Sequence, residues 1–218
     1  SSDLAVTGTR IGSGAERAEV ISACSSPAPT VSTRSPRRAR GATLQMRFQG
    51  IMALKDVQQT EHLRVSTGIG EFDRVLGGGL VPGAAILVSG EPGVGKSTLL
   101  LDVASRVAQT GAKVLYISAE ESVGQVRLRA ERTGALVDSL YLASETGLGI
   151  ILGHIDELAP ELVIIDSVQT VASDAIDGIA GGVSQVREVS QTLVRVAKEK
   201  GIPILLVGHV TKDGTIAG

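Results

Sequence analysis

Short apolar runs alternate with helical periodicity from about residue 84 to residue 208, and this pattern predicts an α/β fold. A run of four or more apolar residues, bounded by polar or glycine positions, suits a strand that is buried on both faces. Such runs lie at residues 84–89, 113–118, 139–143, 161–165 and 203–208. Strands that alternate with helices form parallel sheets, because each connection has to cross back along the sheet. We therefore predict a mostly parallel central sheet flanked by helices.

Helices are predicted in the intervals between these strands. They are expected at residues 98–110, from a Ser122 cap to about residue 133, and at residues 147–158 before Pro160. The most regular amphipathic pattern spans residues 183–200. Its predicted inward face consists of Val183, Val186, Val189, Leu193 and Val196.

A compact segment leads into the first strand. Thr67 suits the cap of a short helix whose apolar side chains face the sheet. The glycines at 77–79 would end that helix, and Pro82 with Gly83 would turn the chain into the strand. A plain glycine linker is the alternative, but the ordered succession favours a defined approach to the core.

The first 50 residues lack sustained periodicity and are rich in Ser, Thr, Gly, Pro and Arg. This composition predicts a disordered extension, with a folded core over residues 51–218. Arginines gather at positions 34, 37, 38, 40 and 47. A basic arm for nucleic acid and an organellar transit peptide over residues 20–48 are two alternatives, and we favour a plain flexible extension.

Composition excludes several classes of protein. The net charge is −2 and the pI is about 5.9, so the chain lacks the overall basic character of proteins held on nucleic acid by bulk electrostatics. The single cysteine, Cys24, can form neither an intrachain disulfide nor a cysteine-based zinc site. No apolar run approaches the ~20 residues of a membrane span. A cytoplasmic protein is expected, or an organellar one if the extension is a transit peptide.

Residues 90–97 carry the most specific chemical signal, the sequence Gly-Glu-Pro-Gly-Val-Gly-Lys-Ser. It matches the phosphate-binding pattern G-x-x-x-x-G-K-[ST] between a predicted strand and a predicted helix. Lys96 would reach the β- and γ-phosphates of ATP, and the Ser97 hydroxyl would bind Mg²⁺. The alternative is a chance glycine-rich turn, but the predicted strand before the motif and the predicted helix after it argue against that alternative. The predicted nucleotide-binding set is Gly90, Glu91, Pro92, Gly93, Val94, Gly95, Lys96, Ser97 and Thr98.

Carboxylates follow two of the predicted strands. Asp166 directly follows the predicted strand at residues 161–165 and is the predicted second Mg²⁺ ligand, usually through water. Glu120 and Glu121 follow the strand at 113–118, either as catalytic carboxylates or as acids that complement a helix dipole. His209, after the last strand, would stand beside the γ-phosphate if that strand neighbours the Asp166 strand, or else be a packed or solvated side chain.

Several segments agree in order and spacing with one known family. They are residues 67–83, 90–100, 120–122, 166–170, 183–188 and 208–214. Together they resemble the ATPase core of the bacterial RadA (Sms) family, whose members are RecA-like DNA repair proteins. The resemblance implies a RecA-like P-loop NTPase fold and a hexameric motor that binds single-stranded DNA, hydrolyses ATP and promotes branch migration with a partner recombinase. It also implies that Glu120 polarises the attacking water, His209 senses the γ-phosphate, and residues 171–182, predicted as a mobile loop, face DNA.

The sequence departs from that family in three ways. The family's four-cysteine zinc module is absent, and its downstream Lys-Asn-Arg-Phe-Gly motif and Lon-protease-like domain would lie beyond Gly218. We therefore expect a core truncated at its C-terminal end. Two other functions stay open: a KaiC-like regulatory ATPase that acts on protein partners, and an ATP-binding module without turnover.

Overall fold

A computed structural model describes residues 6–11, 18–23 and 64–209 of the chain. The chain divides into two compact units, Ser1–Ser25 with Leu63–Gly218, and Ser26–His62. All described residues belong to the first unit. The arginine cluster, the sole cysteine and the segment after His209 lie outside the described residues.

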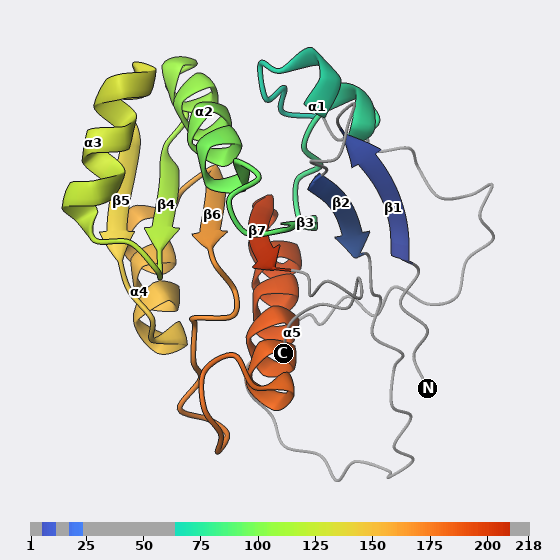
Figure 1. Ribbon diagram of the computed structural model, residues 1–218, viewed down its shortest axis with the longest axis vertical. Coiled ribbons are helices and arrows are strands. Elements are labelled where there is room, and N and C mark those ends of the chain that lie inside the picture. The colour runs from blue at the N-terminus through green and yellow to red at the C-terminus, as the bar shows by residue number, and fades with distance from the viewer. Residues whose placement is uncertain (1–5, 12–17, 24–63, 210–218) are drawn as a thin grey trace, which may run out of the picture. The chain divides into compact units, whose positions relative to one another are not determined.

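The described unit is built on one seven-stranded sheet in the order β1-β2-β3-β7-β6-β4-β5. Strands β3, β7, β6, β4 and β5 run parallel, and β1 and β2 pair antiparallel at the β3 side (Figure 1). The strands are β1 (Val6–Ile11), β2 (Ala18–Ala23), β3 (Ala85–Gly90), β4 (Val114–Ser118), β5 (Leu140–Ser144), β6 (Leu162–Asp166) and β7 (Ile204–His209). The predicted parallel sheet is confirmed, and each predicted strand lies within a residue or so of its observed position.

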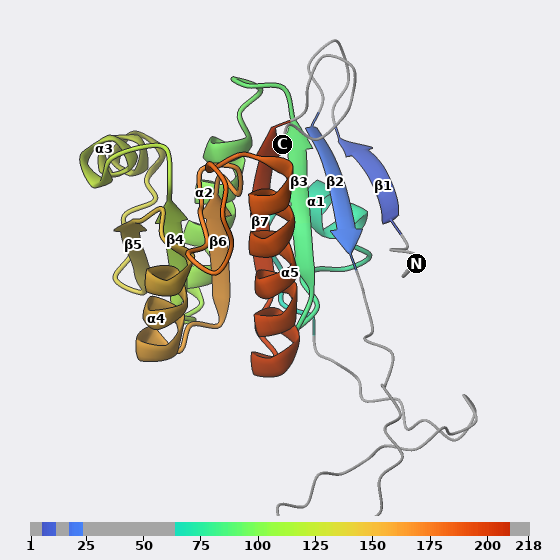
Figure 2. The same cartoon turned by 90° about the horizontal axis from the view of Figure 1, so that it is seen from below.

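Within the described residues, five helices cover the two faces of this sheet. They are α1 (Gly70–Val75), α2 (Lys96–Gln109), α3 (Val123–Thr133), α4 (Leu148–Leu158) and α5 (Val183–Lys200). Helices α2 and α3 cover one face, and α4 and α5 cover the other (Figure 2). Two apolar cores result. Alternate residues of each strand enter opposite cores, as the pleat requires: Ile164 of β6 lies in the α2 core and Ile165 in the α5 core.

The sheet face on which each connecting helix lies explains where a ligand site can form. The connections after β3 and β4 pass along the α2 face, whereas those after β5 and β6 return along the α5 face. The loops that follow β3 and β6 therefore leave the sheet toward opposite faces. In open α/β sheets, this reversal opens a crevice at the carboxyl ends of the strands, where ligands bind.

Two details of the helices differ from expectation. Val183 is exposed rather than inward, and the buried side of α5 includes Gln185 and Thr192. Thr67 does not cap α1, because its N–H and hydroxyl donate to Asp73 Oδ1 at 2.9 and 2.7 Å. Burial raises the pKa of Asp73, but these hydrogen bonds and one from Ser66 outweigh burial and hold that pKa below its ordinary value.

The structure also differs from the expected disorder near the N-terminus. Strands β1 and β2 form an antiparallel pair, and β2 pairs in turn with β3. Both segments contain β-branched residues, which favour extended backbone, and β3 supplies a strand edge for pairing. The prediction of disorder is therefore wrong for residues 6–11 and 18–23. Such short stretches carry too little periodicity to be recognised before their pairing partner is known.

Within the part of the chain that the structure describes, none of the helices combines the length and apolar character that crossing a membrane requires.

Candidate functional site

The predicted phosphate loop lies between β3 and α2, as its sequence pattern requires. Strand β3 ends at Gly90, and α2 begins at Lys96 with Gly95 as its N-cap. Gly93 and Gly95 have φ values of 82° and 91°, in the left-handed region where a side chain is strained. The sequence pattern thus reflects a backbone requirement at these two positions. Other members of the predicted nucleotide-binding set line the same loop: Glu91, Pro92 and Thr98 are exposed, and Val94 and Ser97 are half-buried.

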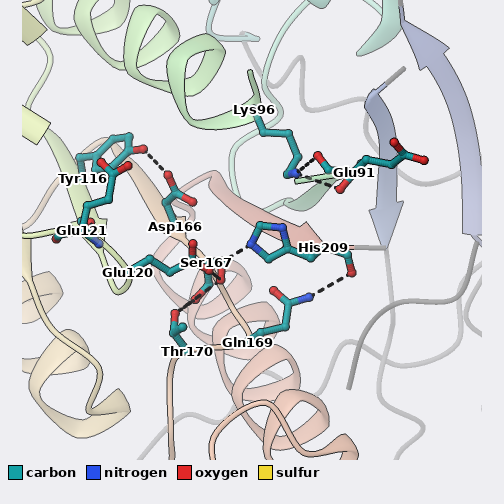
Figure 3. A network of polar contacts seen from close by, with 12 residues as sticks. Glu91, Lys96, Tyr116, Glu120, Glu121, Asp166, Ser167, Gln169, Thr170 and His209 are labelled. Carbon is teal, nitrogen blue, oxygen red and sulfur yellow. Dashed lines mark hydrogen bonds and ion pairs between the residues drawn. The ribbon is translucent and has the colours of Figure 1, made fainter. Parts of the chain in front are cut away.

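Lys96 reaches back across this loop. Its side chain is only 4% exposed, and Nζ donates to the carbonyl oxygens of Gly90 and Glu91, each at 2.8 Å (Figure 3). Burial lowers the pKa of Lys96, and the negative charges of Asp166 and Glu120 oppose that shift. The ammonium group therefore stands at the loop and within the electrostatic reach of two carboxylates that come from other strands.

Strand register brings those carboxylates to the same edge of the sheet. Gly90 pairs with His209, and Ser118 pairs with Asp166. Because these strands are parallel, their carboxyl ends lie together, with the phosphate loop following one of them. The condition set for His209 is met, since β7 lies between β3 and β6.

Asp166 is buried, with 7% of its surface exposed, and it lies on the sheet face that α2 covers. Its Oδ2 accepts a hydrogen bond of 2.6 Å from the Tyr116 hydroxyl, on β4. Burial raises the pKa of Tyr116 well above its ordinary value, and the charge of Asp166 adds to that shift. Ser97, directly after Lys96, and Asp166 offer hydroxyl and carboxylate oxygens, the donors that Mg²⁺ prefers. The two residues therefore fit the predicted metal site in chemistry.

Glu120 belongs to a second cluster at this edge. Its Oε1 accepts a hydrogen bond from the Ser167 hydroxyl and lies 3.0 Å from His209 Nε2 (Figure 3). Burial raises the pKa of Glu120, but the Ser167 and His209 contacts, with the charges of His209 and Lys96, outweigh burial and lower it. Glu120 is thus held as an anion, in the form that can accept a proton or orient water.

Glu121 turns away from this cluster. Its carboxylate pairs with Arg129 on α3, and its N–H donates to the Ser118 hydroxyl at 3.1 Å. Ser122 caps α3, as the sequence predicts. Its hydroxyl accepts a hydrogen bond from the Gln125 N–H, and the Gln125 side chain accepts one from the Ser122 N–H. The two adjacent glutamates therefore differ in their surroundings: Glu120 faces β6 and β7, and Glu121 faces α3.

Sequence reasoning missed the polar partners of the predicted residues. Tyr116, Ser167 and Gln169 had no assigned role, although Gln169 donates to the His209 carbonyl at 3.4 Å. A tyrosine inside the apolar stretch Val-Leu-Tyr-Ile was the one available signal, because a buried hydroxyl requires a partner. The partner itself, 50 positions away, follows only from strand order.

The loop at residues 171–182 is tied to α5 by one side chain. Gln185, only 1% exposed, accepts from the Ser173 N–H at 2.8 Å and donates to the carbonyls of Ser173 and Ile176 at 3.1 and 2.9 Å. Ile179, near the far end of the loop, is 82% exposed. Gln185 also donates to the Gly178 carbonyl at 3.5 Å, so the loop is anchored as far as Gly178, and Ile179 directly after it presents an apolar side chain to the surroundings.

Comparison with known proteins identifies the family of this core. A family model described as "AAA domain" matches residues 56–215. The DNA repair protein RadA of Mycolicibacterium smegmatis is 58% identical over 156 residues, which is 70% of this chain and 34% of that protein. RadA of Bacillus subtilis is 50% identical over 165 residues, 76% of this chain and 36% of that protein. The expected resemblance to RadA is confirmed, and the chain spans about a third of the length of these curated relatives.

A solved structure agrees with the fold. The KaiC-like protein PH0186 from Pyrococcus horikoshii superimposes with a TM-score of 0.56 and 21% identity, over 67% of this chain and 72% of that protein. At this level of identity the likeness concerns the fold alone. It supports the predicted RecA-like α/β architecture.

Proposed function

Because this chain belongs to the AAA domain family and its core is similar to that of the bacterial RadA proteins, we propose that it is the Mg·ATPase core of a DNA repair protein. In this proposal, ATP hydrolysis is coupled to single-stranded DNA binding and to branch migration. One observation carries the proposal: the phosphate loop, Asp166 and the Glu120 cluster meet at one edge of the sheet, although they come from four different strand ends.

Each residue of the site has a distinct task in this proposal. Lys96 and the loop backbone hold the phosphates, with α2 adding the positive end of its dipole. Ser97 and Asp166 hold Mg²⁺, which supplies charge neutralisation for the phosphates when bound. Glu120 accepts a hydrogen bond from the attacking water and aligns it with the γ-phosphate.

His209 and Ser167 keep Glu120 in place. Both contact the same carboxylate oxygen, Oε1, so that the other oxygen is left for water. His209 sits on the strand that neighbours β3, next to Gly90 in register. A change at the γ-phosphate would reach Glu120 through this imidazole, in line with the sensor role that the family resemblance implies.

The loop at 171–182 is the proposed DNA-facing element. It contains Asp174 and Asp177 and no Lys or Arg, so its contact with DNA cannot rest on phosphate charge neutralisation. Exposed Ile179 offers instead an apolar surface against bases. The proposal has three further parts. The DNA substrates include recombination intermediates, and a recombinase is the protein partner. The protein acts as a homo-hexamer in the cytoplasm.

Glu120→Gln tests the catalytic part of the proposal. The amide keeps the size of the side chain but cannot take up a proton, so nucleotide affinity should stay within about twofold while phosphate release falls by about 10²–10⁴-fold. Glu157→Gln, at an exposed position of α4 on the other face of the sheet, is the matched control. Hydrolysis by Glu120→Gln at the parental rate would remove Glu120 from the mechanism.

A further inference from the structure

We propose that Tyr116 is a positioning residue for the magnesium site, because its hydroxyl fixes the orientation of the Asp166 carboxylate. This inference rests on the proposed Mg·ATPase function and adds a residue to it. Tyr116 has no contact with the phosphate loop among the hydrogen bonds of the described residues, so it would act through Asp166 alone.

Strand geometry explains why these two residues meet. In the parallel pair of β4 and β6, Tyr116 is opposite Ile164, and Asp166 is two residues further along β6. Tyr116, Ile164 and Asp166 therefore point to the same face of the sheet, the face that α2 covers. The tyrosine side chain is long enough to reach the carboxylate diagonally across the two strands.

Burial makes the contact obligatory for both partners. Tyr116 is 1% exposed, and its ring packs in the core between the sheet and helices α2 and α3. A buried hydroxyl without a partner would be costly, and Asp166 supplies the acceptor at 2.6 Å. An ionised carboxylate only accepts hydrogen bonds, so the tyrosine donates.

The contact leaves the metal-binding function of Asp166 intact. Tyr116 engages Oδ2, and Oδ1 remains for a metal ion or a water molecule in its shell. The terminal torsion of an aspartate is soft, so a carboxylate without this anchor would sample a broad range of orientations. Partners of metal ligands typically change metal affinity 10–100-fold when they are removed.

An ion pair lies close to Tyr116 and connects strand β4 with helix α3. Glu121 and Arg129 form an ion pair between the end of β4 and helix α3, and Glu121 lies beside Tyr116 in Figure 3. The charges of both residues act on the phenol. Helix α3, which follows the catalytic Glu120, is thereby connected to the magnesium site.

Tyr116→Phe tests the proposal because it keeps the buried ring and removes only the hydroxyl. Tyr141→Phe is the matched control, since Tyr141 is exposed on the neighbouring strand β5 and is the only other tyrosine of the chain. Binding of fluorescently labelled ADP is titrated with Mg²⁺ for the parent chain and for both variants. We expect Tyr116→Phe to need about tenfold more Mg²⁺, with unchanged ADP affinity in EDTA, and Tyr141→Phe to match the parent.

A second measurement keeps Tyr116 in place and so does not depend on the folding of its variant. The chain contains no tryptophan, so Tyr141→Phe leaves Tyr116 as the only tyrosine emitter. A carboxylate hydrogen-bonded to a phenol quenches its fluorescence, and Mg²⁺ added to the ADP complex should change that emission. Ala replacement of Asp166 should abolish the change.

The outcomes separate this inference from the proposed function. If Mg²⁺ strengthens ADP binding equally in the parent and in Tyr116→Phe, or if Tyr116 emission ignores Mg²⁺, the positioning role is wrong and the ATPase proposal stands. If the parent binds no ADP, or binds it without regard to Mg²⁺, both are wrong.

Discussion

At the scale of single residues, the proposed site depends on the carboxylate of Glu120, which residues at the ends of two different strands contact. Glu120 Oε1 is contacted by Ser167, which follows β6, and by His209, which ends β7. Both contacts stabilise the anionic form, and the pKa of Glu120 is lowered although burial raises it. Removing either partner should therefore weaken both the orientation and the ionisation of Glu120.

His209→Ala should shift the pH dependence of hydrolysis in a defined direction. Without the imidazole, the pKa of Glu120 rises toward its ordinary value, so protonation begins at higher pH as the solution is acidified. The acid limb of the pH–rate profile should therefore move to higher pH. Above that limb, phosphate release should fall about tenfold, the weight of one hydrogen bond to a charged group.

His154→Ala provides the matched control, since His154 lies on α4, 3.8 Å from Glu145 and away from the phosphate loop. Its profile should match that of the parent chain. An acid limb that stays in place in His209→Ala would show that this histidine does not influence Glu120.

At the scale of secondary-structure elements, helix α5 controls the loop that precedes it. Gln185 is buried at the start of α5, and its amide contacts four backbone groups of residues 173–178. The predicted inward face of α5 consisted of valines and leucine, and the structure adds this polar anchor at its N-terminal end. The loop is consequently part of the helix packing rather than an independent segment.

Gln185→Ala should loosen the first half of this loop. Four buried or half-buried backbone groups would lose their partner, so the free energy of unfolding should drop by about 1–3 kcal/mol. Hydrogen exchange at the Ser173 amide should accelerate more than exchange in the sheet. Urea unfolding and amide exchange measure the two effects.

Gln191→Ala, at an exposed position of the same helix, is the control and should change neither quantity. Equal exchange at Ser173 in the parent and in Gln185→Ala would mean that other contacts order the loop.

The elements were predictable from sequence to different degrees. Strands β3 to β7 of the parallel sheet and helices α2 to α5 were predictable from apolar runs and periodicity, because the spacing of apolar residues along each segment reflects which side chains are buried. The phosphate loop followed from a motif that its own backbone requires at Gly93 and Gly95. The Tyr116–Asp166 and Ser167–Glu120 contacts could not be predicted, because they join residues 50 and 47 positions apart through strand order.

At the scale of the whole molecule, the described core brings the phosphate loop, Asp166 and Glu120 to one edge of the sheet, and the proposed nucleotide chemistry depends on that arrangement. The chain spans about a third of the length of the RadA relatives that it matches, so the coupling of this core to DNA is a proposal. Strands β1 and β2 extend the parallel sheet with a pair that sequence reasoning had assigned to disorder. The proposed domain boundary at residue 50 stays a prediction.

The most direct test of the central claim is phosphate release by the 218-residue chain with Mg·ATP, with and without single-stranded DNA, compared with Lys96→Ala. Lys113→Ala, at an exposed lysine before β4, controls for the loss of a charge. We predict that the parent chain releases phosphate and that single-stranded DNA stimulates this release. In Lys96→Ala we predict no release, and a nucleotide affinity about 10–100-fold lower than that of the parent chain. Release that persists in Lys96→Ala, or nucleotide binding without any release in the parent chain, would contradict the account.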